Sequence, residues 1–386
     1  MSRRCSPGYA RLDARVTEAM SSVMSAPNGT RPPKVAIVLF NLGGPDSLAA
    51  VRPFLMNLFT DPAILRVPFF IRPFLARIIA RARVKPAREN YALLGGASPL
   101  LELTRRQASA LTAALPEIEV QSFIAMRYWH PFSRAAARAV KAWNPDHVLL
   151  LPLYPQFSTT TTGSSLTAWR EAAAQVGLVK PVTTLCCWHT DPAYLAAIAA
   201  QVRTRYDQAR VEQGAGAKVR VLFSAHGLPE TIVRAGDPYQ AQIETTVGGV
   251  VAALGIPELD HVVCYQSRAT PQQWLQPSTE AELARAGRDG AAVVVVPIAF
   301  VSDHSETLVE LDVEYAAVAR KDGVRGYYRV PAPNDDPAFI VALADIVRRA
   351  LARGPGLCSD AGGRVCADPH GACPFARAAI AREWAA

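Results

Sequence analysis

The chain has 386 residues, of which 50% are hydrophobic and 19% are charged, and its formal net charge is +8. This balance is typical of a globular protein with a sizeable core and excludes a largely disordered chain. No uncharged apolar run approaches the ~20 residues that a membrane span needs, and no nucleic-acid-binding motif accompanies the basic residues. The positive charge therefore favours a carboxylated ligand or an anionic membrane surface as partner, and no nucleic acid is expected.

The first 33 residues contain arginines but no apolar segment of the kind that a secretory signal requires. We interpret residues 1–33 as a disordered tail, or as the product of a start codon placed too early, with Met24 nearer to the true start. An organelle transit peptide is the alternative, and Asp13 and Glu18 argue against it. Seven cysteines, an odd number, do not resemble a secreted disulfide framework. We expect a cytoplasmic protein that can also lie peripherally at the inner face of the membrane.

Three strand-and-turn signals occur twice in the same order, as KVAIVLFNLGGP, VQSFIAMRYWHP and HVLLLPLYPQFSTTTTGSS in the first half and KVRVLFSAHGLP, HVVCYQSRATP and AVVVVPIAFVSDHSETL in the second. Helix-period stretches lie between the strands, at 101–115, 132–143, 194–208 and 279–286. This alternation predicts an α/β fold of two similar Rossmann-like, doubly wound lobes with parallel sheets and a ligand cleft between them. The predicted parts are a first lobe (34–175), a second lobe (176–335), a helix packing back on the lobes (336–352) and a cysteine-containing extension (353–386).

His226 ends the strand signal VLFSAHGLP of the second lobe. A lone histidine in a turn is usually structural, but this one is expected at the same sheet edge as the acidic group described next. A neutral imidazole near carboxylates can act as a general base near neutral pH or bind a divalent transition metal. In contrast, FNLGGP lacks the G-x-G-x-x-G spacing, so no nucleotide cofactor is expected.

The last strand signal runs directly into an acidic segment. Residues 293–296 are four valines between a glycine and a proline, which predicts a buried central strand. Ser302 or Asp303 is then the expected N-cap of an α-helix over 305–315.

Glu306, Glu310 and Glu314 would share one face of that helix. Such a ladder of carboxylates is either a solvated acidic face or the wall of a ligand site. Because ligands bind beyond the carboxyl ends of strands in open α/β sheets, the position of Asp303, His304 and Glu306 favours a site for a cation or for proton transfer.

Seven motifs together resemble the ferrochelatase family, from about Lys34 to Ala352: LFNLGGP, GGASPL, RYWHP, LPLYPQFSTTTTGSS, LFSAHGLP, GDPY and PIAFVSDHSETLVELDVEY. The resemblance implies a lyase that inserts ferrous iron into protoporphyrin IX to form protohaem, with the porphyrin in the cleft between the lobes. A coproporphyrin ferrochelatase or a cobalt chelatase would use the same residues. A non-catalytic tetrapyrrole-binding protein is the alternative from another class.

The resemblance also implies roles for single residues. His226 matches the family's essential histidine, as proton acceptor or metal ligand, and Glu306 matches the glutamate that faces it across the pocket. The polar path behind them, for protons or metal, corresponds to Asp303, His304, Glu310 and Glu314. The positions implied to bind porphyrin are Arg83, Ser98, Arg127 and Tyr128, and the arginines suit its carboxylates.

Residues 65–83, LRVPFFIRPFLARIIARAR, combine phenylalanines and isoleucines with arginines. They form either part of the core or an exposed apolar lip with basic flanks that suits an anionic bilayer surface. The family has a hydrophobic lip at this place. A poorly soluble porphyrin could be collected there.

Cys358, Cys366 and Cys373 resemble the cysteines by which some ferrochelatases hold a 2Fe-2S cluster, which takes four ligands. Animal members supply the fourth ligand at the position of Thr159, so a different residue is needed here. We expect Cys186 or Cys187, with only one of the two facing the extension, or else Cys264. Zinc with His370 as the fourth ligand, and free thiols, are the alternatives.

Overall fold

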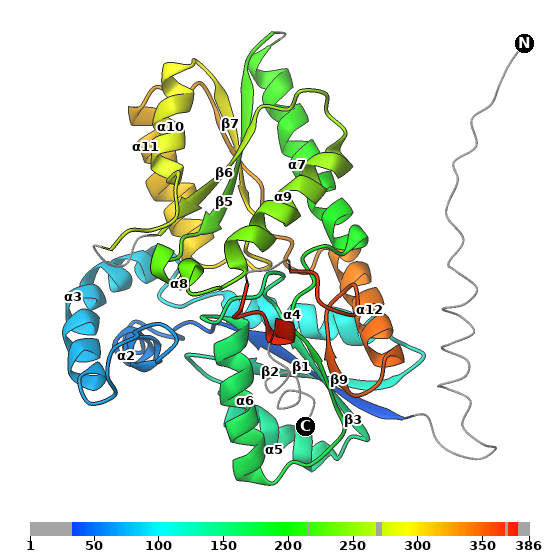
Figure 1. Cartoon of the computed structure of the whole chain (residues 1–386). Helices are drawn as coiled ribbons and strands as arrows, with labels where there is room; N and C mark the ends of the chain where they lie inside the picture. The colour runs from blue at the N-terminus through cyan, green and yellow to red at the C-terminus, as the bar shows by residue number, and fades with distance from the viewer. Residues whose placement is uncertain (1–32, 215, 268–271, 367–369, 377–386) are drawn as a thin grey trace, which may run out of the picture.

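The computed structural model describes residues 33–214, 216–267, 272–366 and 370–376. Two parallel sheets form the centres of two α/β lobes, one above the other in Figure 1. The predicted α/β class with two similar doubly wound lobes is confirmed. The tail expected over residues 1–33 lies, except for its last residue, outside the described residues.

The first lobe contains a five-stranded parallel sheet in the order β2-β1-β3-β4-β9. Alternate residues of its central strand β1 (Lys34–Asn41) face opposite layers, so Val35, Ile37 and Leu39 lie in one core and their neighbours in another. Helix α4 (Leu100–Ala113) covers the first face, and α5 (Ser133–Trp143) and α6 (Thr162–Val176) cover the second. The other strands are β2 (Glu119–Met126), β3 (His147–Pro152), β4 (Val182–Leu185) and β9 (Gly356–Cys358).

The second lobe contains a four-stranded parallel sheet in the order β6-β5-β7-β8. Its strands are β5 (Val219–His226), β6 (His261–Gln266), β7 (Ala292–Pro297) and β8 (Tyr327–Arg329). Strand β5 lies between β6 and β7 as β1 lies between β2 and β3, which explains the twofold repeat of strand signals. The covering helices are α7 (Pro192–Gln213) and α9 (Tyr239–Leu254) on one face and α10 (Thr279–Arg288) and α11 (Ala316–Lys321) on the other; α8 (Glu230–Arg234) is a short helix after β5.

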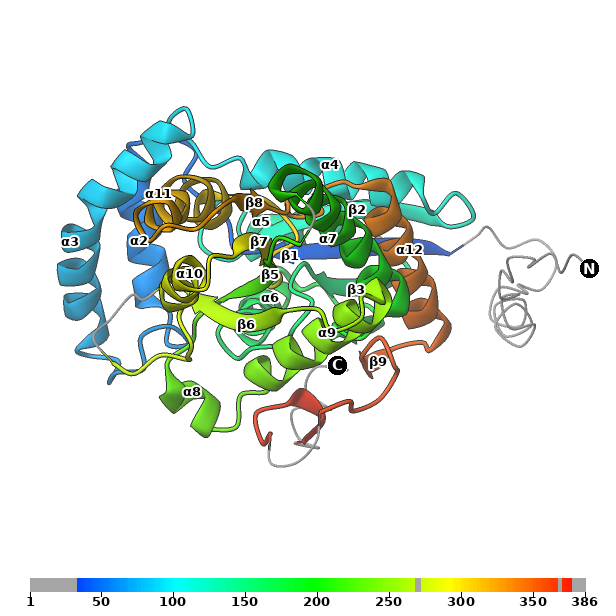
Figure 2. The same cartoon turned by 90° about the horizontal axis from the view of Figure 1, so that it is seen from above.

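Three further segments lie around the two lobes. Helix α12 (Pro337–Ala352) is N-capped by Asp336 and packs on α7 and α4. Helices α2 (Val51–Thr60) and α3 (Arg72–Leu93) pack together as an arm at one end of the molecule, with α12 at the opposite end (Figures 1 and 2). In the part of the chain that the structure describes, no helix has both the length and the apolar character needed to cross a membrane.

The acidic helix differs from its prediction. Residues Glu306–Tyr315 form a π-helix, η1, which continues into α11, and its N-cap residue Ser305 makes no side-chain capping bond. The expected α-helix with Ser302 or Asp303 as N-cap is therefore wrong. The Ser302 hydroxyl donates to Gln107 instead, and the Asp303 carboxylate accepts from Arg329 and Asn334. π-Helical segments are rare in proteins and are frequently found at functional sites.

Candidate active site

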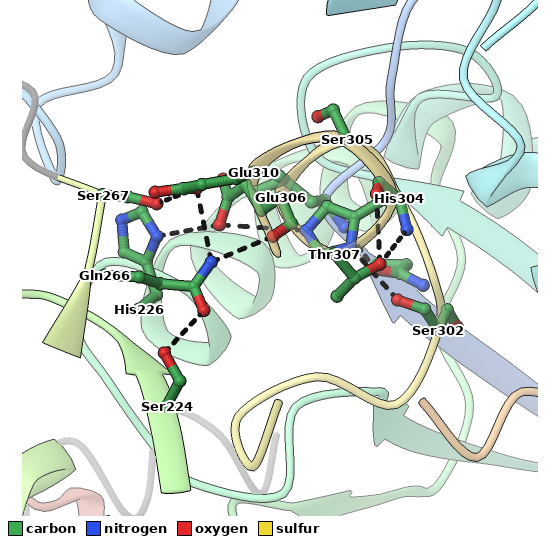
Figure 3. Close-up of polar contacts among 12 residues, drawn as sticks. Ser224, His226, Gln266, Ser267, Ser302, His304, Ser305, Glu306, Thr307 and Glu310 are labelled. Atoms are coloured by element: carbon green, nitrogen blue, oxygen red, sulfur yellow. Dashed lines mark hydrogen bonds and ion pairs between the residues drawn. The ribbon is translucent and has the colours of Figure 1, made fainter. Parts of the chain in front are cut away.

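His226 and Glu306 meet at the carboxyl edge of the second sheet. His226 is the last residue of β5, and Glu306 begins η1 shortly after the neighbouring strand β7. His226 Nδ1 lies 2.8 Å from Glu306 Oε2, and the two side chains are 37% and 27% exposed (Figure 3). The adjacency expected from the sequence is thus present, with access for a ligand.

Each partner of this pair changes the pKa of the other. Burial lowers the pKa of His226, but the Glu306 carboxylate outweighs it and the pKa lies above 6.5. Burial alone would raise the pKa of Glu306, but His226 and His304 bring it down to about 2. The contact therefore makes the His226 imidazole a stronger base and stabilises its charged form once it has taken up a proton.

Behind this pair lie His304 and Glu310. His304 Nε2 is 3.9 Å from the same Glu306 oxygen, and its Nδ1 is 3.1 Å from the Ser302 carbonyl oxygen. Burial and the charge of Glu306 raise the pKa of Glu310, so the second carboxyl of the ladder holds a proton more readily than the first. This difference suits a stepwise proton relay.

Gln266 was not predicted from the sequence, although it joins most of the site. It ends β6, pairs in register with His226 and is buried. Its amide donates to the Glu306 carbonyl oxygen at 3.0 Å and to the Glu310 carboxylate at 3.3 Å, and it accepts from the Ser224 hydroxyl at 2.9 Å (Figure 3). The sequence could have indicated Gln266 only through its position at the end of the strand beside β5, since glutamine belongs to no recognisable catalytic motif.

The other two members of the predicted path, Asp303 and Glu314, lie away from the His226–Glu306 pair. Both carboxylate oxygens of Asp303 are engaged, one by Arg329 and the other by Asn334 at 2.8 Å each, so Asp303 anchors the loop and does not extend the ladder. Glu314 is exposed at the far end of η1 and accepts from Asn90 of α3 at 3.3 Å. The ladder thus runs from Glu306 past Glu310 to the surface beside the arm.

The residues implied to bind porphyrin lie in the first lobe and the arm. Ser98 packs against Gly44, where an added Cβ would lie 2.4 Å from its hydroxyl oxygen. Arg83 is exposed on α3. No direct contact between these side chains and the His226–Glu306 pair is present in the described structure.

Arg127 and Tyr128 depend on a buried carboxylate, Asp61, that the sequence reading missed. The Tyr128 hydroxyl donates to Asp61 at 2.8 Å, Arg127 Nη2 lies 2.7 Å from it, and the Ser164 hydroxyl donates at 2.5 Å. Tyr128 is fully buried in this structure, and its porphyrin-binding role stays a prediction. Its hydroxyl helps to hold Asp61, and through it Arg127.

The apolar residues before and along α3 are exposed. Phe69, Phe70, Phe74 and Ile78 are 79%, 69%, 66% and 50% exposed, so the core-packing alternative does not hold for them. We call these four residues the lip. Arg77 and Arg81 flank the lip on the surface, whereas the Arg72 guanidinium donates to the carbonyls of Leu65 and Val67.

Five cysteines gather where the extension crosses between the lobes. Strand β9 brings Cys358 beside Cys186, whose amide donates to the Cys358 carbonyl at 2.9 Å. The sulfurs of Cys186 and Cys187 lie 3.5 Å apart, so the vicinal thiols do not point in opposite directions as expected. A hydrogen bond from Cys366 lowers the pKa of Cys373 to about 6. Cys366 in turn accepts from Gln242 at 2.9 Å.

These cysteines are the kind of donor that a thiolate-bound centre requires. Among the described residues, no group of three or more His, Cys, Asp or Glu side chains is arranged to hold a metal ion, so this structure shows neither a 2Fe-2S site nor the zinc alternative with His370. Cys264 is buried in the core of the second lobe with α10 and β7, which removes it as a fourth ligand. The Thr159 hydroxyl donates to Asp237. One oxygen of Asp360, a neighbour of Cys187, is buried without a hydrogen-bond partner among the described residues.

Comparisons with known proteins identify the family. The two parallel sheets with helices on their faces define a two-lobed α/β protein. The ferrochelatase family model matches residues 34–351, and the chain belongs to the ferrochelatase family. It is therefore a lyase of the kind that inserts ferrous iron, its metal substrate, into a porphyrin.

Curated relatives cover nearly the whole chain. The ferrochelatase of Caulobacter vibrioides is 50% identical over 352 residues, covering 90% of this chain and 99% of its own. The ferrochelatase of Phenylobacterium zucineum is 49% identical over 349 residues, covering 88% and 99%. Among solved structures, SirB from Bacillus subtilis with Fe3+ matches with a TM-score of 0.48 and 13% identity, covering 83% of this chain and 96% of that one.

Proposed function

We propose that the enzyme inserts ferrous iron into protoporphyrin IX to form protohaem and that the His226–Glu306 pair is the insertion centre. The observation that supports this most is the 2.8 Å contact between an imidazole and a carboxylate at the carboxyl edge of the second sheet. Insertion replaces two pyrrole protons by a dication. A centre for this reaction needs a group that accepts protons and a group that attracts the metal.

His226 is the proposed acceptor of the pyrrole protons, or the first protein ligand of the incoming iron. Glu306 would stabilise the charged imidazole and attract the dication. Glu310, whose pKa is raised, would take protons onward toward Glu314 and solvent. The acidic ladder is thus read as a route through which charge passes between the porphyrin and the surface.

The substrate choice is open to a direct test. Purified enzyme is assayed anaerobically with protoporphyrin IX and with coproporphyrin, each with ferrous and with cobaltous ions, and metalloporphyrin formation is followed by absorbance. We expect the highest kcat/KM for protoporphyrin IX with ferrous iron. A preference for coproporphyrin or for cobalt would replace this assignment, and tight binding without turnover would favour a tetrapyrrole carrier.

The lip is the proposed contact with an anionic membrane surface, where a poorly soluble porphyrin is available. Four large apolar side chains, exposed by half or more, are flanked by Arg77 and Arg81. Exposed apolar groups with basic neighbours suit the boundary between headgroups and acyl chains. The enzyme would then be peripheral and would not span the bilayer.

The cysteine group is the proposed site of a 2Fe-2S cluster. Cys358, Cys366, Cys373 and one of Cys186 and Cys187 would be its four thiolate ligands. Support comes from the proximity of these thiols, since Cys186 interacts electrostatically with Cys358, Cys366 and Cys373. When bound, the cluster would supply a redox-active centre and folding energy to a segment with little core of its own.

A further inference from the structure

The side chain of Gln107, in the first lobe, makes its hydrogen bonds to the second lobe, near the candidate active site. It lies on α4 and is fully buried. Its amide nitrogen donates to the carbonyl oxygens of Val301 and Asn334, at 2.8 Å each, and its amide oxygen accepts from the Ser302 hydroxyl at 3.0 Å. A single side chain therefore fills three hydrogen-bonding positions across the two lobes.

The segment that Gln107 holds leads directly to the reaction centre. Val301 and Ser302 lie between the end of β7 and the start of η1, and the Ser302 carbonyl oxygen is 3.1 Å from His304 Nδ1. The second segment is fixed to the first, since the Asn334 amide donates to Val301 and its side chain donates to Asp303. Gln107 thus contacts the loop from which both His304 and Glu306 extend.

We propose that Gln107 is a positioning residue that sets the loop 301–304, and through it His304 and Glu306, relative to the first lobe. This inference rests on the proposed function, because it takes Glu306 as part of the insertion centre. Its role differs from that of Gln266, which holds η1 to the strands of its own lobe. Gln107 ties the same centre to the opposite lobe.

The physical reason is the cost of leaving buried polar groups unpaired. Without the amide, the Asn334 carbonyl and the Ser302 hydroxyl lose their Gln107 partner, and the Val301 carbonyl keeps only the Asn334 amide, so the loop can regain these hydrogen bonds only by moving. A displacement of about 1 Å at catalytic groups can lower a rate on the order of 10²-fold. Porphyrin contacts elsewhere in the first lobe would be unaffected by such a shift.

The test compares Gln107→Met, which keeps the volume but removes all three hydrogen bonds, with two other variants. Ser302→Ala removes one of the three bonds and serves if Gln107→Met does not fold. Thr112→Val is the matched control, because Thr112 lies on the same helix but bonds only to Ala108 and Ser122 of the first lobe. For each protein, kcat, KM for porphyrin, KM for ferrous iron and Tm are measured.

We expect kcat to fall by at least about tenfold in Gln107→Met and less in Ser302→Ala, with KM for porphyrin changed less than about twofold. Thr112→Val should retain the parental kcat even if its Tm falls as far as that of Gln107→Met. Unchanged kcat in both Gln107→Met and Ser302→Ala, or a loss that follows Tm in all three variants, would overturn the inference. Activity in His226→Ala would instead refute the proposed function, so the two failures are distinguishable.

Discussion

Glu306 and Glu310 are four residues apart on η1, but their pKa values are shifted in opposite directions. Contact with His226 and His304 holds the pKa of Glu306 at about 2, whereas burial and the neighbouring charge raise the pKa of Glu310. Sequence spacing placed both carboxylates on one face of a helix but did not distinguish their pKa values. The difference arises from partners on β5 and on the loop after β7, which spacing along one helix cannot reveal.

This difference leads to unequal effects of neutral substitutions. Glu306→Gln should lose on the order of 10²–10⁴-fold in kcat, because an amide neither stabilises the imidazolium nor attracts a dication. Glu310→Gln should lose clearly less, since Glu310 already holds a proton more readily. Steady-state kinetics on both variants check this. Wild-type rates in both would support the alternative that these glutamates form only a solvated acidic face.

Asp61 belongs to none of the sequence motifs, but it holds Arg127, which belongs to the motif RYWHP. The Asp61 side chain is 2% exposed, and its carboxylate is bound by Arg127, Tyr128 and Ser164. Asp61→Ala should lower the free energy of unfolding by about 3–5 kcal/mol, the usual cost of breaking a buried ion pair. Denaturant unfolding measures it, and a change below about 1 kcal/mol would contradict the central role of Asp61.

At the scale of elements, the three repeated strands of each lobe followed from the sequence better than the helices did. The twofold repeat predicted both sheets, because buried β-branched runs ending in turn residues give a strong strand signal. Helix α9 was missed, since Ala, Val and Gly follow one another there without a clear polar face. The π-helix could not be predicted, because its register depends on contacts such as Tyr315 with Glu310, at 3.1 Å.

The arm gives a prediction about membranes. Replacing Arg77 and Arg81 by glutamate should weaken binding to anionic vesicles by about 1 kcal/mol for each lost basic residue, or more because the charge is reversed, and added salt should weaken the parent similarly. Arg72 is unsuitable for this test because its guanidinium holds the carbonyls of Leu65 and Val67. Vesicle sedimentation is the measurement; salt-independent binding, or none by the parent, would exclude the electrostatic contribution.

At the scale of the whole molecule, the extension links parts of both lobes. Strand β9 extends the first sheet beside β4, while the Ala372 amide donates to Gly236 of the second lobe at 3.1 Å. Gly236 has φ +93°, and an added Cβ would lie 2.9 Å from the backbone nitrogen of Gly371. The sequence indicated the cysteines but not this path, because three-residue strands at a sheet edge have too little pattern to be recognised.

The cluster proposal predicts colour and composition. Protein purified without oxygen should be red-brown, with about two iron and two acid-labile sulfide per chain. Of Cys186→Ser and Cys187→Ser, one should lose the colour and the other keep it, and Cys264→Ser is the control that should keep it. Colourless parent protein with freely titratable Cys358, Cys366 and Cys373 would show that the cluster is absent. The assignment of chelatase activity does not depend on this result.

The central claim is that the His226–Glu306 pair carries out metal insertion. The most direct measurement is the anaerobic rate of protohaem formation by His226→Ala and by the parent, with porphyrin binding measured in parallel by fluorescence. We predict a fall in turnover of roughly 10²–10⁴-fold or more with porphyrin affinity retained, because the group that accepts the pyrrole protons is gone. Near-parental turnover in His226→Ala would contradict the assignment of this pair as the insertion centre.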